Sequence, residues 1–116
     1  MKYLMLICDD EQAWGRLPDK DRSEMMGEYR RLIDRLKRSG HYLGGSQLQP
    51  TSTATSVRVR NGKRMVTDGP FAETKEQLGG YYLVEAKDID EAAKIGANIP
   101  WARSGSIEVR PIMVFE

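Results

Sequence analysis

Residues 81–99 read YYLVEAKDIDEAAKIGANI, and this stretch decides the fold. Its first six residues, 81–86, are aromatic or apolar except for Glu85, a composition typical of a strand. Asp88 followed three residues later by Glu91 has the pattern of a capping box, which predicts a helix start. The helix then runs through Ala92, Ala93, Ile95 and Ile99 and must end before Pro100. The stretch therefore predicts a strand followed directly by a helix.

The N-terminal part of the chain repeats this order. Residues 3–8 form a short apolar run that predicts a first strand, and a polar connection follows it. Apolar residues at steps of three and four then predict one face of a helix: Met25, Met26, Tyr29, Leu32, Ile33 and Leu36. Asp21 with Glu24 is a candidate capping box for this helix. Gly40 is placed to end it in the left-handed conformation.

A hairpin separates the two strand–helix units. Residues 41–49 predict a second strand, with a bulge or a close backbone contact at Gly44-Gly45. Beyond it, residues 56–60 and 63–67 flank Asn61-Gly62, a pair typical of a type I′ turn because both central residues need positive φ. Residues 68–70 (Asp-Gly-Pro) predict another turn, and residues 107–115 predict the last strand.

The predicted order is β-α-β, hairpin, β-α-β. Two right-handed crossovers that return to the same sheet place both helices on one face. We therefore predict an α+β, ferredoxin-like fold with an antiparallel sheet and an inserted hairpin. With 116 residues, the chain has the length of one domain, residues 1–116.

The strands are apolar on both sides, although two helices cover only one face of the sheet. Residues 3–8, 81–84 and 107–115 have no consistent alternation of apolar and polar residues. A second apolar face marks an interaction surface, and a copy of the same chain is the simplest cover. We predict a homodimer; the alternative is that the hairpin and long loops fold back over this face.

Composition limits the remaining classes. The chain carries 18 Lys and Arg against 17 Asp and Glu, a net charge of +1. It lacks the overall positive charge that is typical of nucleic-acid-binding proteins, so we predict no nucleic-acid partner. Its single cysteine, Cys8, suits a reducing compartment. The longest apolar run, residues 3–8, is far shorter than a membrane span of about 20 residues. We expect a cytoplasmic protein without a membrane partner.

Residues 68–86, DGPFAETKEQLGGYYLVEA, resemble the DGPF-domain proteins of the YCII-related family. The resemblance extends over essentially the whole chain, including residues 1–10, 43–50, 55–62 and 107–112. It implies the dimeric α/β-barrel superfamily, in which two ferredoxin-like sheets pack face to face.

The resemblance implies less about activity. Family members are mostly bacterial proteins of unassigned activity, some encoded beside or fused to extracytoplasmic-function sigma factors, and the wider superfamily includes monooxygenases and lactone isomerases. YCII relatives carry a histidine near the start of the first long helix, proposed to act with an aspartate. This chain has Met25-Met26 in that region, so it departs from the His–Asp pattern.

Two residues are candidates for acid–base catalysis. Asp68 begins the polar loop 68–76 and is a candidate general base, with His41, the one histidine, or Lys75 as its proton partner. The alternatives are structural: Asp68 closes a turn through its side chain, Phe71 plugs the core, and His41 stabilises a helix end. Convergence of Asp68, His41 and Arg110 on an enclosed pocket would favour an enzyme.

Candidate ligand-binding residues gather on the hairpin and on the loop after it. Period-two geometry places Arg58 and Arg60 on one face, with Lys63 opposite Arg60. These cations fit a small anionic ligand or an acidic protein partner, or they are a solvated edge. The full set of ligand-binding candidates is Arg58, Arg60, Lys63, Phe71, Glu73, Lys75 and Arg110.

No metal or cofactor is predicted. Asp9, Asp10 and Glu11 are consecutive and cannot all face one ion, and Cys8 beside them is expected to be a small buried residue. No glycine-rich phosphate loop is present. The aromatic residues are sufficient to line a small apolar pocket: Trp14, Tyr29, Tyr81, Tyr82 and Trp101.

Three functions remain open. The leading hypothesis is a small-molecule-binding or regulatory accessory module. The second is a cofactor-independent lyase or isomerase that uses Asp68. The third is an interaction module for a sigma factor or a similar regulator, acting through the basic hairpin.

Overall fold

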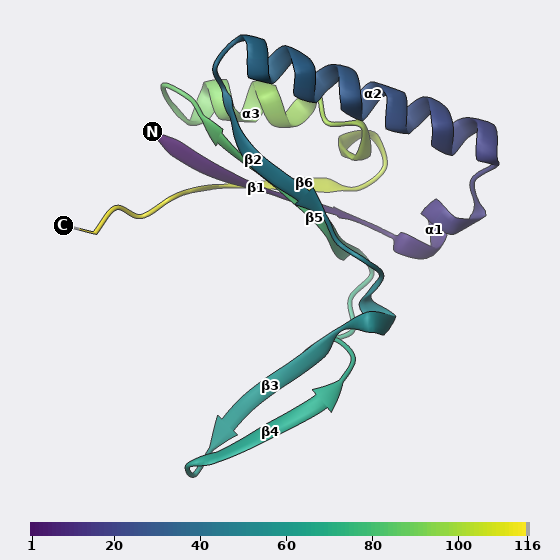
Figure 1. The fold of residues 1–116 in the computed structure, drawn as a ribbon, viewed down its shortest axis with the longest axis vertical. Coiled ribbons are helices and arrows are strands. Elements are labelled where there is room, and N and C mark those ends of the chain that lie inside the picture. Colours follow the sequence, from purple (N-terminus) through teal and green to yellow (C-terminus); the bar gives the residue numbers. More distant parts are fainter. Residues whose placement is uncertain (116) are drawn as a thin grey trace.

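A computed structural model describes residues 1–115 and contains a four-stranded antiparallel sheet and a separate two-stranded hairpin (Figure 1). The sheet strands are β1 (Lys2–Asp9), β2 (Tyr42–Gln47), β5 (Gln77–Glu85) and β6 (Ser106–Pro111), in the order β2-β5-β1-β6. The hairpin pairs β3 (Thr55–Arg60) with β4 (Lys63–Asp68). The helices are α1 (Glu11–Arg16), α2 (Asp19–Arg38) and α3 (Ile89–Ala97), with 3-10 turns at Thr51–Thr53 and Pro100–Arg103.

The sheet has the ferredoxin-like order that the sequence predicts. Strand β5 lies between β1 and β2 and is antiparallel to both, so the first β-α-β unit is split by a strand of the second. Helices α2 and α3 lie on the same face of the sheet (Figure 1). The α+β prediction is therefore confirmed.

The core lies between this face and the two helices. On β1, Tyr3, Met5 and Ile7 are buried, while the alternating residues are half-exposed. Tyr82 and Val84 extend the buried row onto β5. From the helix layer they meet buried side chains of α2 and α3: Leu32, Leu36, Ala92 and Ile95. Period-two alternation on β1 thus separates one buried face from one open face.

The two ends of α2 differ in how well the sequence predicts them. Pro18 precedes the helix, and the backbone N–H of Asp21 donates to its carbonyl at 3.0 Å. Asp21 thus lies inside the first turn of a helix that begins at Asp19. The predicted Asp21–Glu24 capping box is wrong, because the backbone N–H of Asp21 is already bonded to a carbonyl of that turn. Gly40 has φ of +80° at the other end, as predicted.

The start of α3 is close to its prediction, whereas α1 was missed. The N–H of Glu91 donates to the Asp88 carboxylate at 2.9 Å, but the Glu91 carboxylate accepts from the N–H of Lys87 rather than from Asp88. Helix α1 occupies part of the expected polar connection because Asp10 caps it. None of the helices within residues 1–115 is long and apolar enough to cross a membrane.

The hairpin β3–β4, which we call the arm (residues 55–68), projects from the sheet on the side away from α2 and α3 (Figure 1). Asn61 and Gly62 both have positive φ, as a type I′ turn requires. At the base of the arm, the N–H of Gly69 donates to the carbonyl of Ala54 at 2.7 Å. The arm therefore does not cover the second face of its own sheet, contrary to the alternative above.

The last strand is shorter than predicted. β6 ends at Pro111, and one further backbone hydrogen bond follows it, from the N–H of Ile112 to the carbonyl of Lys2 at 2.9 Å. Residues 112–115 are not part of the strand. The last three of these, Met113, Val114 and Phe115, are 73% to 85% exposed. The expectation that residues 107–115 are apolar on both sides is correspondingly wrong: on β6, Ile107 and Val109 face the helices, while Glu108 and Arg110 lie on the opposite face.

The face opposite the helices, which we call the open face, carries an apolar row on its two central strands, β1 and β5. Leu4 and Leu6 on β1 and Tyr81 and Leu83 on β5 are half-exposed there. Leu78 is 40% exposed beside them. Within the described chain, no helix covers this row (Figure 1).

Substitution of two glycines by alanine is expected to have opposite effects on the free energy of unfolding. A Cβ at Gly40 or at Gly15 would touch nothing within 4 Å, so only the backbone differs. Gly40→Ala forces a left-handed alanine and should destabilise the protein by roughly 1–2 kcal/mol. Gly15→Ala, within α1, should stabilise it by about 0.5–1 kcal/mol. Urea unfolding measures both, and equal shifts for the two would contradict the assignment.

Candidate functional site

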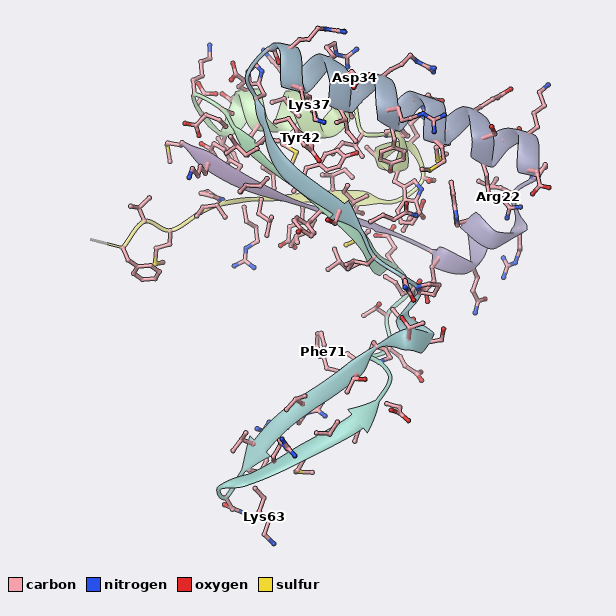
Figure 2. All side chains as sticks on the ribbon, in the orientation of Figure 1. Arg22, Asp34, Lys37, Tyr42, Lys63 and Phe71 are labelled. Atoms are coloured by element: carbon pink, nitrogen blue, oxygen red, sulfur yellow. The ribbon has the colours of Figure 1, made fainter. Side chains whose placement is uncertain are left out.

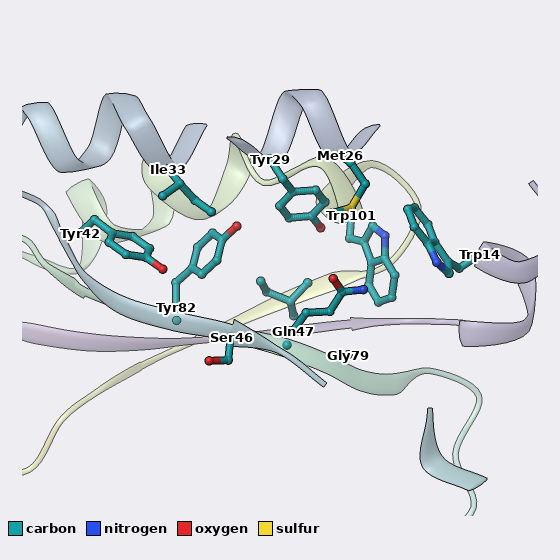
Figure 3. A pocket seen from close by; sticks show the side chains of 13 residues that line it. Trp14, Met26, Tyr29, Ile33, Tyr42, Ser46, Gln47, Gly79, Tyr82 and Trp101 are labelled. Carbon is teal, nitrogen blue, oxygen red and sulfur yellow. The ribbon is translucent and has the colours of Figure 1, made fainter. Parts of the chain in front are cut away.

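A cavity of about 260 Å³ lies between α2 and the sheet, at the end where β2 and β5 carry glycines (Figure 3). Residues of both the sheet and the helix layer line it. Met26, Tyr29 and Ile33 descend from α2, and Ile7 and Tyr82 rise from the sheet. The remaining lining residues are Trp14, Tyr42, Gly45, Ser46, Gln47, Gly79, Gly80 and Trp101.

Glycines make room for the aromatic rings of the cavity. A Cβ on Gly79 would lie 2.6 Å from Cζ3 of Trp101, so the indole packs directly on the strand backbone. A Cβ on Gly45 would lie 2.6 Å from Cδ1 of Tyr82 and 2.6 Å from the carbonyl oxygen of Tyr81. These strand glycines are positions where another group approaches the backbone closely, as strand glycines often are.

The rings form two pairs across the cavity. Trp14 and Trp101 are tilted, with centroids 6.1 Å apart, and Tyr42 meets Tyr82 edge-on at 5.6 Å. Both distances fall in the range in which aromatic pairs attract, worth about 0.5–1.5 kcal/mol beyond burial. The Nζ of Lys37 lies 5.6 Å from the centroid of the Tyr42 ring, which the two labelled side chains in Figure 2 illustrate.

The cavity is uncharged at neutral pH. Burial raises the pKa of Tyr29, against a smaller opposing effect of a backbone hydrogen bond at Trp101, and burial also raises the pKa of Tyr82. Both phenols are therefore neutral hydroxyls that donate or accept hydrogen bonds. The lining residues include no Asp, Glu, Lys, Arg or His. The site suits recognition of an uncharged apolar group rather than an ion.

Four of the five aromatic residues that the sequence proposes for a pocket lie in this cavity. They are Trp14, Tyr29, Tyr82 and Trp101. Tyr81 does not, because neighbouring strand residues point to opposite faces and Tyr82 occupies the helix side. Sequence reasoning missed Met26, Ile33 and Gln47, which carry no motif and become recognisable only once α2 and β2 are placed.

The candidate catalytic residues are not brought together within this chain. His41 lies between α2 and β2, with Nδ1 2.7 Å from Ser39 Oγ and Nε2 3.1 Å from Glu91 Oε1. It thereby joins the end of α2 to the start of α3. Asp68 is exposed at the end of β4, in the other sheet. Arg110 is exposed on β6, 3.7 Å from Glu108.

The Asp68 turn is held by other groups than predicted. No side-chain hydrogen bond of Asp68 is present among residues 1–115. Instead, Gly69 adopts φ of +96°, and Ser56 Oγ donates to its carbonyl at 2.7 Å. Phe71 is 81% exposed and stands clear of the core (Figure 2), so its predicted role as a core plug is wrong.

The loop 68–76 borders a second hollow, of about 420 Å³, that is lined mostly by polar residues. Glu73 and Pro70 line it together with Glu11 and Thr51, whereas Lys75 is exposed outside its lining. Glu11 is already engaged, since its carboxylate accepts from the N–H of Thr51 at 3.1 Å. This hollow lacks the aromatic walls of the first cavity.

Three of the four basic residues of the arm share one face, as predicted, whereas Arg64 pairs with Val59 and lies on the other face. The register pairs Arg60 with Lys63 and Arg58 with Met65, so the three cations lie on one side and Val57, Val59 and Val66 on the other. Arg58 donates to the carbonyl of Phe71 at 3.4 Å. Arg58, Arg60 and Lys63 form no ion pair within the described part of the chain.

The acidic run after β1 has separate structural partners. Asp10 accepts from the N–H of Gln12 at 3.0 Å, and Asp9 accepts from the N–H of its neighbour at 2.7 Å. Cys8 is half-buried on the open-face side of β1, whereas the sequence predicts a buried residue. Burial raises the pKa of its thiol, and the carboxylates of Glu76 and Glu108 raise it further.

Alkaline titration should distinguish the cavity tyrosines from ordinary ones. In the folded protein the pKa values of Tyr29 and Tyr82 lie above 10, the ordinary value. The stability contributed by their burial is full below pH 10 and is lost as pH rises beyond it, because unfolded tyrosines ionise first. Tyrosinate absorbance should show a late step that coincides with unfolding, and Tyr29→Phe should reduce it. A single step near pH 10 for all five tyrosines would contradict this.

Comparison with known proteins places the chain in a family. The YCII-related domain matches residues 1–116. "Uncharacterized protein R00369" of Rhizobium meliloti (strain 1021) is 32% identical over 118 residues, covering 100% of this chain and 95% of that protein. "Uncharacterized protein YjpA" of Bacillus subtilis (strain 168) is 40% identical over 52 residues, covering 45% of this chain and 58% of that protein. A match over the whole length shows that the chain belongs to the YCII-related domain family.

Proposed function

We propose that this protein is a binding module for a small, uncharged aromatic or aliphatic molecule, and that it acts as a homodimer. The observation that carries the first part is the 260 Å³ cavity walled by Trp14, Tyr29, Tyr82 and Trp101. Cavities that are mostly apolar, with a few polar groups, are typical of small-molecule sites. This one lies between a helix and a sheet and is already formed in the single chain.

The lining predicts the chemistry of the ligand. Burial of a charged group without a partner is costly, and the cavity offers it no counter-ion. Tyr29 and Gln47 supply the polar contacts: Figure 3 shows the Tyr29 ring descending from α2 and the Gln47 amide beside the Trp101 indole. We therefore expect a flat apolar ligand with one hydroxyl or carbonyl group that accepts or donates a hydrogen bond.

The two tryptophans give a direct test of binding. Trp14 and Trp101 are the only tryptophans in the sequence, and both line the cavity. We expect 2-naphthol to shift both indole N–H resonances in a nitrogen–proton correlation spectrum. The charged analogue 2-naphthoate should shift them far less, because its carboxylate would be buried without a counter-ion.

A filled cavity should abolish this response. Ile33→Phe adds a ring to the lining, while Ile112→Phe places the same ring outside the sheet as a matched control. We expect loss of the naphthol shifts in the first variant and unchanged shifts in the second. Equal binding of naphthol and naphthoate, or binding that survives Ile33→Phe, would contradict the proposed site.

The open face supports the second part of the proposal. Leu4, Leu6, Tyr81 and Leu83 form a contiguous apolar row, and Leu78 adjoins it. A large apolar patch of this kind marks an interaction surface. A two-fold dimer would bury the row against its own copy, since an isologous interface is self-complementary.

A single charge on the open face should weaken the dimer. We expect the wild-type chain to have the mass of a dimer in light scattering at micromolar concentration, and Leu4→Asp to shift it toward monomer. Ala93→Asp, on the exposed side of α3, is the control and should leave the mass unchanged. Circular dichroism checks that Leu4→Asp is folded. A wild-type monomer at these concentrations would refute the dimer and leave the cavity proposal untouched.

A further inference from the structure

The arm has the surface of a segment that packs against something, yet the described chain provides no cover for it. On one face, Val57, Val59 and Val66 are 60%, 61% and 54% exposed. On the other face, Met65 is 48% exposed beside the cations. An isolated two-stranded hairpin is marginally stable in water, and exposed apolar strands invite association. We therefore expect a partner surface to cover the exposed apolar residues of the arm.

Charge divides this chain into a basic arm and an acidic remainder. Residues 55–68 contain four cations, Arg58, Arg60, Lys63 and Arg64, and one carboxylate, Asp68, so the arm carries +3. Since the whole chain carries +1, the remainder carries −2. The charge of the arm is therefore complementary to the body of a second copy, which favours such an encounter over one between two arms.

Two carboxylates lie on the part of a second copy that such an arm would contact. Glu108 is opposite Leu6 in the register and so belongs to the open face. Among residues 1–115, its one ion pair is the 3.7 Å contact with exposed Arg110. Glu76 lies just before β5. Both carboxylates act on the Cys8 thiol, which sits at the same end of the open face. This end of the sheet is the one from which the arm projects (Figure 1).

We infer that each arm clasps a second copy of this chain, with its basic face on Glu76 and Glu108 of that copy. The arm extends on the open-face side of the sheet, so a copy seated on that face lies beside it (Figure 1). Two-fold symmetry then exchanges the arms and neutralises both basic faces at once. This inference rests on the proposed dimer but not on ligand binding in the cavity.

Reversal of charge on either side should produce copies that pair only with each other. Arg58→Glu with Arg60→Glu gives an arm-reversed chain, and Glu76→Lys with Glu108→Lys gives a body-reversed chain. Each alone places like charges together, so its dimer dissociation constant should rise about tenfold or more. An equimolar mixture should form heterodimers with near wild-type affinity, because both arms then meet opposite charge. Analytical ultracentrifugation with one chain labelled measures all three.

The control and the outcomes separate this clasp from its rivals. Lys20→Glu with Arg30→Glu makes the same charge change on exposed positions of α2 and should leave dimerisation unchanged. If the equimolar mixture does not recover the wild-type affinity, the clasp is wrong. That result would mean that the arm contacts its own chain and not the second copy. A wild-type dimer unaffected by either reversal would also overturn it, and leave an acidic protein as the partner of the arm. A wild-type monomer would refute the clasp together with the dimer.

Discussion

The packing of α2 and α3 on one face of β1 is the constraint on which the rest of the structure depends. Tyr3, Met5 and Ile7 are buried by this contact, and it commits every second residue of the central strand to the opposite face. Because α2 and α3 both lie on the first face, neither of these two helices covers the second face (Figure 1). The helix layer also produces the cavity. Where α2 passes over the glycines of β2 and β5, the strands have no side chains that fill the space beneath the helix.

The sequence predicts most of the frame, because its elements are marked by local chemistry. Gly40 and the Asn61-Gly62 turn adopt the positive φ values that their residue types favour. Prediction failed where two local rules competed. Asp21 resembles a cap, but α2 already begins at Asp19. Residues 112–115 resemble a strand, but backbone pairing with β1 stops at the hydrogen bond from Ile112 to Lys2. In each case the backbone hydrogen bonds set the end of the element at a different residue from the one that the local pattern indicates.

The site was less predictable than the frame. Aromatic content indicated an apolar pocket, but alternation along a strand decides which of two adjacent tyrosines enters it, and the bulges on β2 and β5 shift that alternation. The recognisable motif 68–76 drew attention to Asp68 and Phe71, which lie on the arm side and are exposed. The cavity is instead built from residues dispersed over six elements, whose common location is a property of tertiary packing.

The hydrogen bond between Gly69 and Ala54 has a consequence for how such chains diversify. It brings the two ends of the arm within one backbone contact of each other, so the path of the chain from β2 to β5 is the same whatever lies between them. Residues added or removed in cross-strand pairs would lengthen or shorten the hairpin without a change in the register of the main sheet. A change in the length of the hairpin would therefore leave the sheet and its cavity as they are.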